Sequence, residues 1–159
     1  MEVIEKDAFE NCKKLIRIVL PENVKRLPES AMIGEQAFSG CGKLCEIKIS
    51  DRVTKLGECC FEKCISLKGF DFHGIKFIGE RAFSRCEGLE EIVLLMLCVR
   101  RRSFEDCCFL KRVSLISDTE LKSGVFFGCT NIEEIVLDGV SYSFKMFSQS
   151  VRSFENSLP

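Results

Sequence analysis

Residues 37–49 read Ala-Phe-Ser-Gly-Cys-Gly-Lys-Leu-Cys-Glu-Ile-Lys-Ile, and the spacing of their apolar residues recurs along the chain. A phenylalanine column returns roughly every 22 residues, a period typical of solenoid repeats. Its members are Phe9, Phe38, Phe61, Phe83, Phe104, Phe126 and Phe147. A second column, three positions later, consists of Cys12, Cys41, Cys64, Cys86, Cys107 and Cys129. Since further leucine and isoleucine columns keep the same register, the chain is a tandem repeat.

Each unit combines two kinds of apolar spacing. Leu44, Ile47 and Ile49 end in the two-residue alternation of a β-strand. The segment 33–41 spaces its apolar residues by four, one and three positions, which favours a single tight helical or 3₁₀ turn. A unit this short cannot bury its own apolar face, so stacked units must share one core.

Two places depart from the period. The hexamer 27–32 copies the form of 33–38, and we expect one of the two, the proline-bearing first in preference to the second, to bulge out of its coil. The last unit keeps Phe147 but carries polar residues at the Cys, Leu and Ile positions, as a terminal cap should. Those residues are Ser150, Ser153 and Asn156.

The stretch Ala37–Leu44, followed by Ile47-Lys-Ile49 and Val53-x-x-Leu56-Gly57, resembles the BspA-type leucine-rich repeat. The resemblance extends from about Ile4 to Leu158. It implies a right-handed leucine-rich-repeat superhelix, α/β to mostly β, with one parallel strand and one short helical or 3₁₀ return segment per repeat. We expect one solenoid over residues 1–159, with six clear repeats and a degenerate C-terminal capping repeat, or a segment of a longer repeat chain.

This resemblance also implies a function. Proteins with this repeat occur on the surfaces of host-associated bacteria and in parasitic protists, where they generally act as adhesion or protein-binding surfaces. None of the repeat positions is catalytic in the family. The resemblance therefore implies a protein interaction or adhesion module that is not an enzyme and uses no cofactor.

The composition excludes several other classes. The 23 Lys and Arg residues against 24 Asp and Glu leave a formal net charge of −1, which argues against nucleic-acid binding. The longest uninterrupted apolar run, Ile92–Val99, is too short to cross a bilayer, and the N-terminus lacks the regions of a signal peptide. Localisation stays open, because the resemblance favours a surface or secreted protein whereas the 11 cysteines favour a reducing compartment.

Cysteine chemistry is the alternative function. The cysteine column is best interpreted as core, since free cysteine packs as a small apolar residue. Of the five irregular cysteines, Cys60 is expected in the core and Cys45 and Cys108 at the surface; the other two are Cys59 and Cys98. A thiol-based metal-binding or redox protein would use this irregular set, although no Cys-x-x-Cys pair occurs.

Two further features have simple interpretations. His73 is the single histidine, which excludes multi-histidine metal sites, and its place after a strand predicts an exposed turn. The run Arg100–Arg102 is interpreted as a solvated coil edge in preference to a phosphate or acidic-partner site.

A partner is expected on the face that the strands expose, since stacking aligns equivalent side chains in columns. The mixed charges there favour a protein over nucleic acid or membrane, unless the face is only a solvated sheet. The candidate residues are Arg17, Val19, Glu46, Lys48, Asp71, Glu91, Val93, Arg112, Ser114, Glu134 and Val136. The first unit, Ile4–Leu20, matches the interior pattern, so we also expect an apolar edge there that invites self-association.

Overall fold

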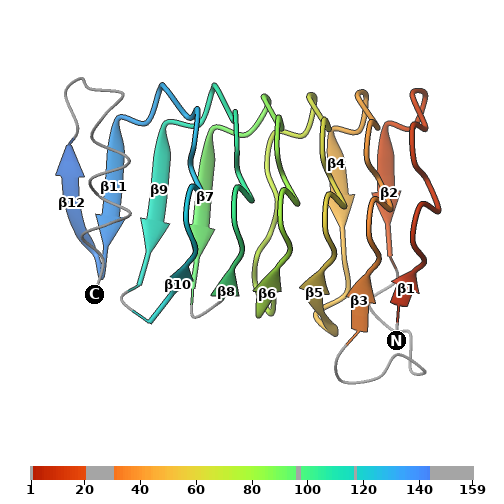
Figure 1. The fold of residues 1–159 in the computed structure, drawn as a ribbon, viewed down its shortest axis with the longest axis horizontal. Helices are drawn as coiled ribbons and strands as arrows, with labels where there is room; N and C mark the ends of the chain where they lie inside the picture. Colours follow the sequence, from red (N-terminus) through yellow and green to blue (C-terminus); the bar gives the residue numbers. More distant parts are fainter. Residues whose placement is uncertain (1, 21–30, 96–97, 117, 144–159) are drawn as a thin grey trace.

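The computed structural model describes residues 2–20, 31–95, 98–116 and 118–143, and its coils stack along one axis (Figure 1). The solenoid predicted from the repeat is thereby confirmed. Strands with the predicted alternation are β2 (Arg17–Val19), β4 (Glu46–Lys48), β7 (Glu91–Leu94), β9 (Arg112–Leu115) and β11 (Glu134–Leu137). A second set of strands consists of β1 (Glu2–Ile4), β3 (Ala31–Ile33), β5 (Val53–Leu56), β6 (Phe77–Ile78), β8 (Cys98–Val99) and β10 (Glu120–Leu121).

The two sets of strands form two rows along the solenoid (Figure 1). The second set makes one parallel sheet in the order β1-β3-β5-β6-β8-β10. The first set is divided into a β2-β4 pair and a sheet of β7, β9 and β11, to which β12 (Val140–Ser143) adds an antiparallel edge. In the β7-β9-β11 sheet equivalent positions pair in register, as Ile92 does with Val113 and Val113 with Ile135, whereas β3 pairs with β1 and β5 through a register shift. Repeat positions on β7, β9 and β11 therefore lie directly against their counterparts in the next coil.

The predicted helical return segment is wrong. The return begins with a strand of the second sheet and continues as successive turns, and the described residues contain no helix. Positions two before and two after each core phenylalanine adopt the left-handed conformation, which a right-handed helix excludes. They are Asp7, Asn11, Gln36, Gly40, Cys59, Lys63, Arg81, Arg85, Arg102, Asp106, Gly124 and Gly128.

Left-handed residues redirect the backbone hydrogen bonds of these turn segments. The amides of Gln36, Phe38 and Gly40 donate to carbonyls of the following coil, those of Glu58, Cys60 and Glu62, at 2.8 Å. Intervening amides instead close turns within their own coil, as Ser39 does to Gln36 at 2.9 Å. The turn segments therefore join neighbouring coils through backbone hydrogen bonds, as the sheets do.

Two strand positions also differ from expectation. Phe70 and Phe72 keep the apolar alternation, yet residues 68–72 form no strand. Tyr142 stands five residues before Phe147, as Leu121 does before Phe126, which predicts equivalent positions; Tyr142 lies instead in β12 and pairs with Ile135 of β11. The chain turns back after β11, with left-handed Asp138 and Gly139 at the reversal, so Tyr142 is half-exposed.

The duplicated hexamer and the cap fall partly outside the described residues. Ile33–Phe38 occupies the coil, because Ile33 pairs with both Ile4 and Leu56, and Phe38 joins the phenylalanine column. Residues 27–30 of the first hexamer lie outside the described residues. The predicted cap, from Phe147 to Asn156, lies outside them as well.

Stacked phenylalanine rings form the centre of the core. Neighbouring ring centroids lie 5.2 Å apart from Phe9 to Phe38 and from Phe38 to Phe61, and 5.3 Å apart from Phe83 to Phe104. These pairs are nearly coplanar, with interplanar angles of 1°, 2° and 4°. Phe38, Phe61, Phe83 and Phe104 are fully buried, so the stack runs continuously through the solenoid.

Removing one ring from this stack should destabilise the whole solenoid. Phe83 is fully buried and contacts the rings of Phe61 and Phe104. Phe83→Ala should lower the free energy of unfolding by about 3–5 kcal/mol, measured in denaturant melts, because it leaves a cavity that the neighbouring coils cannot fill. Phe109→Ala is the matched control, since Phe109 is exposed. If Phe83→Ala lowers the free energy of unfolding by less than about 1 kcal/mol, the phenylalanine stack is not a main source of stability.

Candidate functional site

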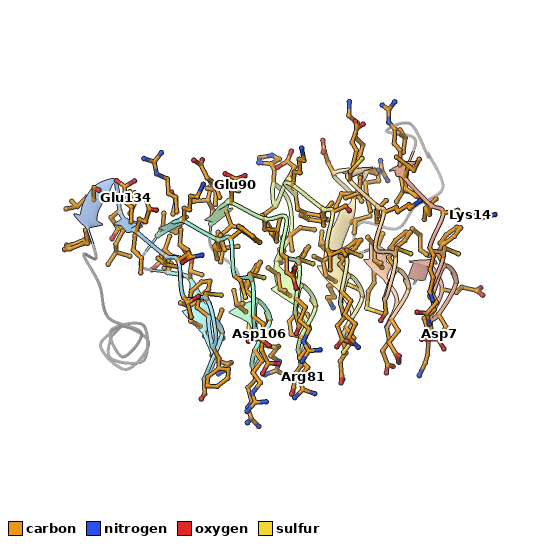
Figure 2. The ribbon with its side chains drawn as sticks, turned by 90° about the horizontal axis from the view of Figure 1, so that it is seen from above. Asp7, Lys14, Arg81, Glu90, Asp106 and Glu134 are labelled. Atoms are coloured by element: carbon orange, nitrogen blue, oxygen red, sulfur yellow. The ribbon has the colours of Figure 1, made fainter. Side chains whose placement is uncertain are left out.

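The strand face is the surface formed by outward side chains of β2, β4, residues 68–72, β7, β9 and β11. Figure 2 shows Glu90 and Glu134 on this side and Arg81 and Asp106 on the opposite, turn side. All eleven predicted candidates are at least partly exposed. Arg17, Val19, Lys48, Asp71, Glu91, Val93 and Arg112 are exposed, and Glu46, Ser114, Glu134 and Val136 are half-buried.

Ion pairs between coils order much of this face. Arg17 Nε lies 3.1 Å from a Glu46 carboxylate oxygen, and Lys111 Nζ lies 3.2 Å from Glu90. Arg112 pairs with Glu134, whose carboxylate also accepts a hydrogen bond from Ser141. The Ser141 hydroxyl and then the Arg112 guanidinium lower the pKa of Glu134. Exposed pairs add little stability, but they hold the charged groups in fixed positions.

Apolar side chains interrupt the charges at two places. Val19 lies on β2 of the N-terminal pair β2-β4, and Val93 and Leu95 are each about half-exposed at β7. The column predicts Val19 and Val93 but not Leu95, which follows the buried Leu94. The signal for Leu95 is the apolar run that continues beyond the strand. Single exposed apolar residues are common on protein surfaces, so these side chains mark a candidate contact surface only together with the charges around them.

The cysteine column lies in the core, as predicted, with Cys12 of the first coil only partly buried. Each thiol from Cys41 onward donates to the carbonyl of the phenylalanine in the preceding coil. Cys41 Sγ lies 3.0 Å from Phe9 O, Cys64 Sγ 3.2 Å from Phe38 O, and Cys86 Sγ 3.0 Å from Phe61 O. The column thus makes a ladder of S–H···O bonds that a purely apolar residue could not form.

Burial opposes ionisation of these thiols. Desolvation raises the pKa of Cys64 and Cys86 well above the ordinary range. A nucleophilic or metal-binding cysteine needs the thiolate, which a lowered pKa supplies. The column is therefore placed to pack and to donate hydrogen bonds.

The irregular cysteines occupy dissimilar sites. Cys60 is buried and Cys45 is exposed, as predicted, whereas Cys108 is only partly exposed. Partial burial, together with the carboxylates of Glu62 and Glu58, raises the pKa of Cys59 to about 11. Burial also raises the pKa of Cys98 and Cys108. None of these three shifted thiols is activated by its surroundings.

Within the described ranges, no three His, Cys, Asp or Glu side chains lie together as metal ligands, and no helix is long and apolar enough to cross a membrane. His73 lies in an exposed turn, as predicted, and its backbone amide donates to Asp71 Oδ1 at 2.9 Å.

The arginine run lies along the second sheet. The guanidinium of Arg100 lies 5.4 Å from the ring centre of Phe77, and that of Arg102 lies 5.6 Å from Phe127. Arg102 also pairs with Glu105 at 3.3 Å. Two of the three guanidinium groups thus have aromatic partners within the chain, which is the arrangement expected of a coil edge.

Comparisons with known proteins agree with this geometry. A family model described as BspA type leucine rich repeat region, in 6 copies, matches residues 2–133 and 74–157. The crystal structure of a leucine-rich repeat protein of T. pallidum superposes with a TM-score of 0.76 at 30% identity, covering 96% of this chain and 76% of that chain. No curated protein matches the chain.

A second solved structure shares the fold. A leucine-rich cell surface protein from Faecalibacterium prausnitzii A2-165 superposes with a TM-score of 0.54 at 22% identity. The match covers 99% of this chain and 34% of that longer one.

Thiol labelling should distinguish the core cysteines from the exposed one. With iodoacetamide under native conditions, Cys45 should react fast and the buried column slowly, because only an accessible thiolate can attack the reagent and displace iodide. Intact mass should show loss of the fast label in Cys45→Ser. Denatured, non-reduced protein should take up label at all 11 cysteines. Missing labels in that sample would reveal disulfides and contradict a reduced column.

Proposed function

Because the chain belongs to the BspA-type leucine-rich repeat family, we propose that it is a non-catalytic module that binds a protein partner through its strand face. The observation that carries the proposal is the row of exposed side chains with both charge signs and exposed valines. Val19 and Val93 are each about half-exposed within that row. Aromatic or aliphatic contacts ringed by polar groups are the common composition of protein interfaces.

Charge distribution favours a protein over nucleic acid. Acidic and basic residues lie beside one another in neighbouring coils of the strand face, as Arg17 does with Glu46 and Arg112 with both Glu91 and Glu134. A phosphate backbone would instead require a stripe of one sign. The thiol alternative has no comparable support, because the environments of Cys59, Cys98 and Cys108 raise their pKa.

Site-specific photo-crosslinking in the cells that make the protein tests this proposal. Benzoylphenylalanine at Lys48 or Ser114, on the strand face, should give discrete protein adducts that mass spectrometry can identify. The same residue at Lys63 or Arg85, on the turn side, is the matched control and should give none. Both control positions are exposed. Adducts from the turn side alone, or from neither side, would overturn the proposal.

We propose in addition that the first coil associates with a second copy of the chain. Phe9, Cys12, Leu15, Ile18 and Leu20 pack against the core but are only partly buried, whereas the corresponding Phe83, Cys86, Leu89, Ile92 and Leu94 of the fourth coil are buried. In the part of the chain that the structure describes, β1 pairs only with β3 and β2 only with β4. An uncovered apolar surface beside two open strand edges favours association.

Sedimentation velocity tests this association. The protein should form a concentration-dependent dimer, and Phe9→Glu should remain monomeric because a carboxylate cannot enter an apolar contact without cost. Phe109→Glu, a charge placed on an exposed phenylalanine elsewhere, should still dimerise. If the unmodified protein stays monomeric at high concentration and Ile4–Leu20 resists hydrogen exchange like the central coils, the first coil is self-sufficient and the association is refuted.

A further inference from the structure

The first row of strands is broken at the third coil. Strand β4 pairs with β2, and β7 pairs with β9, but residues 68–72 between them join neither sheet. Within the described residues, β7 has no strand partner on the edge that faces this segment. An unpaired edge presents backbone N–H and C=O groups that another extended chain can bond.

Aromatic packing explains the break. Phe70 and Phe72 replace the smaller Ile47 and Ile49 of the preceding coil. The Phe70 ring lies 5.0 Å from Phe83, and the Phe72 ring 5.3 Å from it, both edge-on at 71° and 63°. Two rings of this size fill the space between the strand face and the phenylalanine stack. They thereby hold residues 68–72 out of strand register.

A cavity lies beside β7, where residues 68–72 form no strand pairing with it. It has a volume of about 750 Å³ and lies between residues 69–76 and β7. Its apolar lining includes Phe72, Ile75, Val93 and Leu95. At its margin Gly69 has no side chain, and a Cβ added there would meet nothing within 4 Å. We call this cavity the third-coil groove.

Charged groups line the groove without being paired to each other. Asp71, Lys76 and Glu91 all belong to the lining. No ion pair among the described residues includes any of them, in contrast to Glu46, Glu90 and Glu134 on the same face. Two carboxylates against one ammonium group leave the groove with an excess of negative charge. A basic side chain of a ligand would complement it.

We propose that the third-coil groove binds an extended segment of the protein partner, which inserts one large apolar side chain and carries a lysine or arginine beside it. This inference rests on the proposed function and assigns its main contact to one place on the strand face. An extended peptide can make more of the contacts that the groove offers than a compact ligand can. Its backbone can bond the open edge of β7 while a side chain fills the apolar lining.

The test uses a phage-displayed library of random 12-residue peptides selected on the intact protein. Enriched sequences should combine a large apolar residue with a neighbouring Lys or Arg. Synthetic fluorescent copies are then titrated by anisotropy against the unmodified protein, Gly69→Trp and Phe109→Trp. Gly69→Trp places a ring at the margin of the groove without a backbone clash, because a Cβ added at Gly69 meets nothing within 4 Å. Phe109→Trp places the same ring at an exposed position outside both the groove and the strand face.

Gly69→Trp should weaken peptide binding by about tenfold or more, the loss expected when a central apolar contact is blocked. Phe109→Trp should change it by less than about twofold, a small fraction of a tenfold step. Peptides whose affinity is unchanged by Gly69→Trp would overturn the groove and leave the strand face as the binding surface. Failure to enrich any peptide, with strand-face crosslinks still formed, would also overturn the groove alone. Failure of both would overturn the proposed function as well.

Discussion

Hydrogen bonds fix the distance between neighbouring coils, and every interior side chain has to fit that distance. Paired strands lie about 4.8 Å apart, and the phenylalanine rings stack at 5.2–5.8 Å between centroids. Each position therefore needs a residue whose size matches its counterpart one coil away. This requirement produces the phenylalanine, cysteine and leucine columns, and it makes the cysteine thiol useful because it reaches the carbonyl of the preceding coil.

The same requirement explains which features were predictable. Burial of Phe83, Cys86 and Leu89 follows from the period, since stacked units place identical residues together. The left-handed backbone conformation of the turn positions could not be predicted from the period, because residues as different as Gln36 and Arg81 adopt it. The spacing of apolar residues indicates which side chains share a face. It does not distinguish a helix from a series of tight turns, because both are compatible with the same spacing.

The candidate surface was predictable in outline and not in detail. Alternation placed Val93 and Glu91 on the outside correctly, since strand residues alternate between faces. The break at the third coil was not predictable from apolar pattern, because Phe70 and Phe72 satisfy that pattern as well as isoleucine does. We attribute the groove to the size of the two rings and not to their hydrophobicity. Their size matters because Phe70 packs against Phe83 and Phe72 against Phe104, contacts that appear only in the folded chain.

In the turn segments, the backbone amides that donate to another coil all point in the same direction along the solenoid axis. Phe38 donates to Cys60, Phe61 to Ala82, and Phe83 to Ser103, always from one coil to the next. Bonds of the parallel strands run in both directions, as Leu20 to Lys48 and Cys45 to Ile16 show, so their dipoles largely cancel. The turn side thus carries a net electric dipole along the axis, with its positive end toward the later coils. This polarity is opposite to that of an α-helix, whose positive end is its N-terminus.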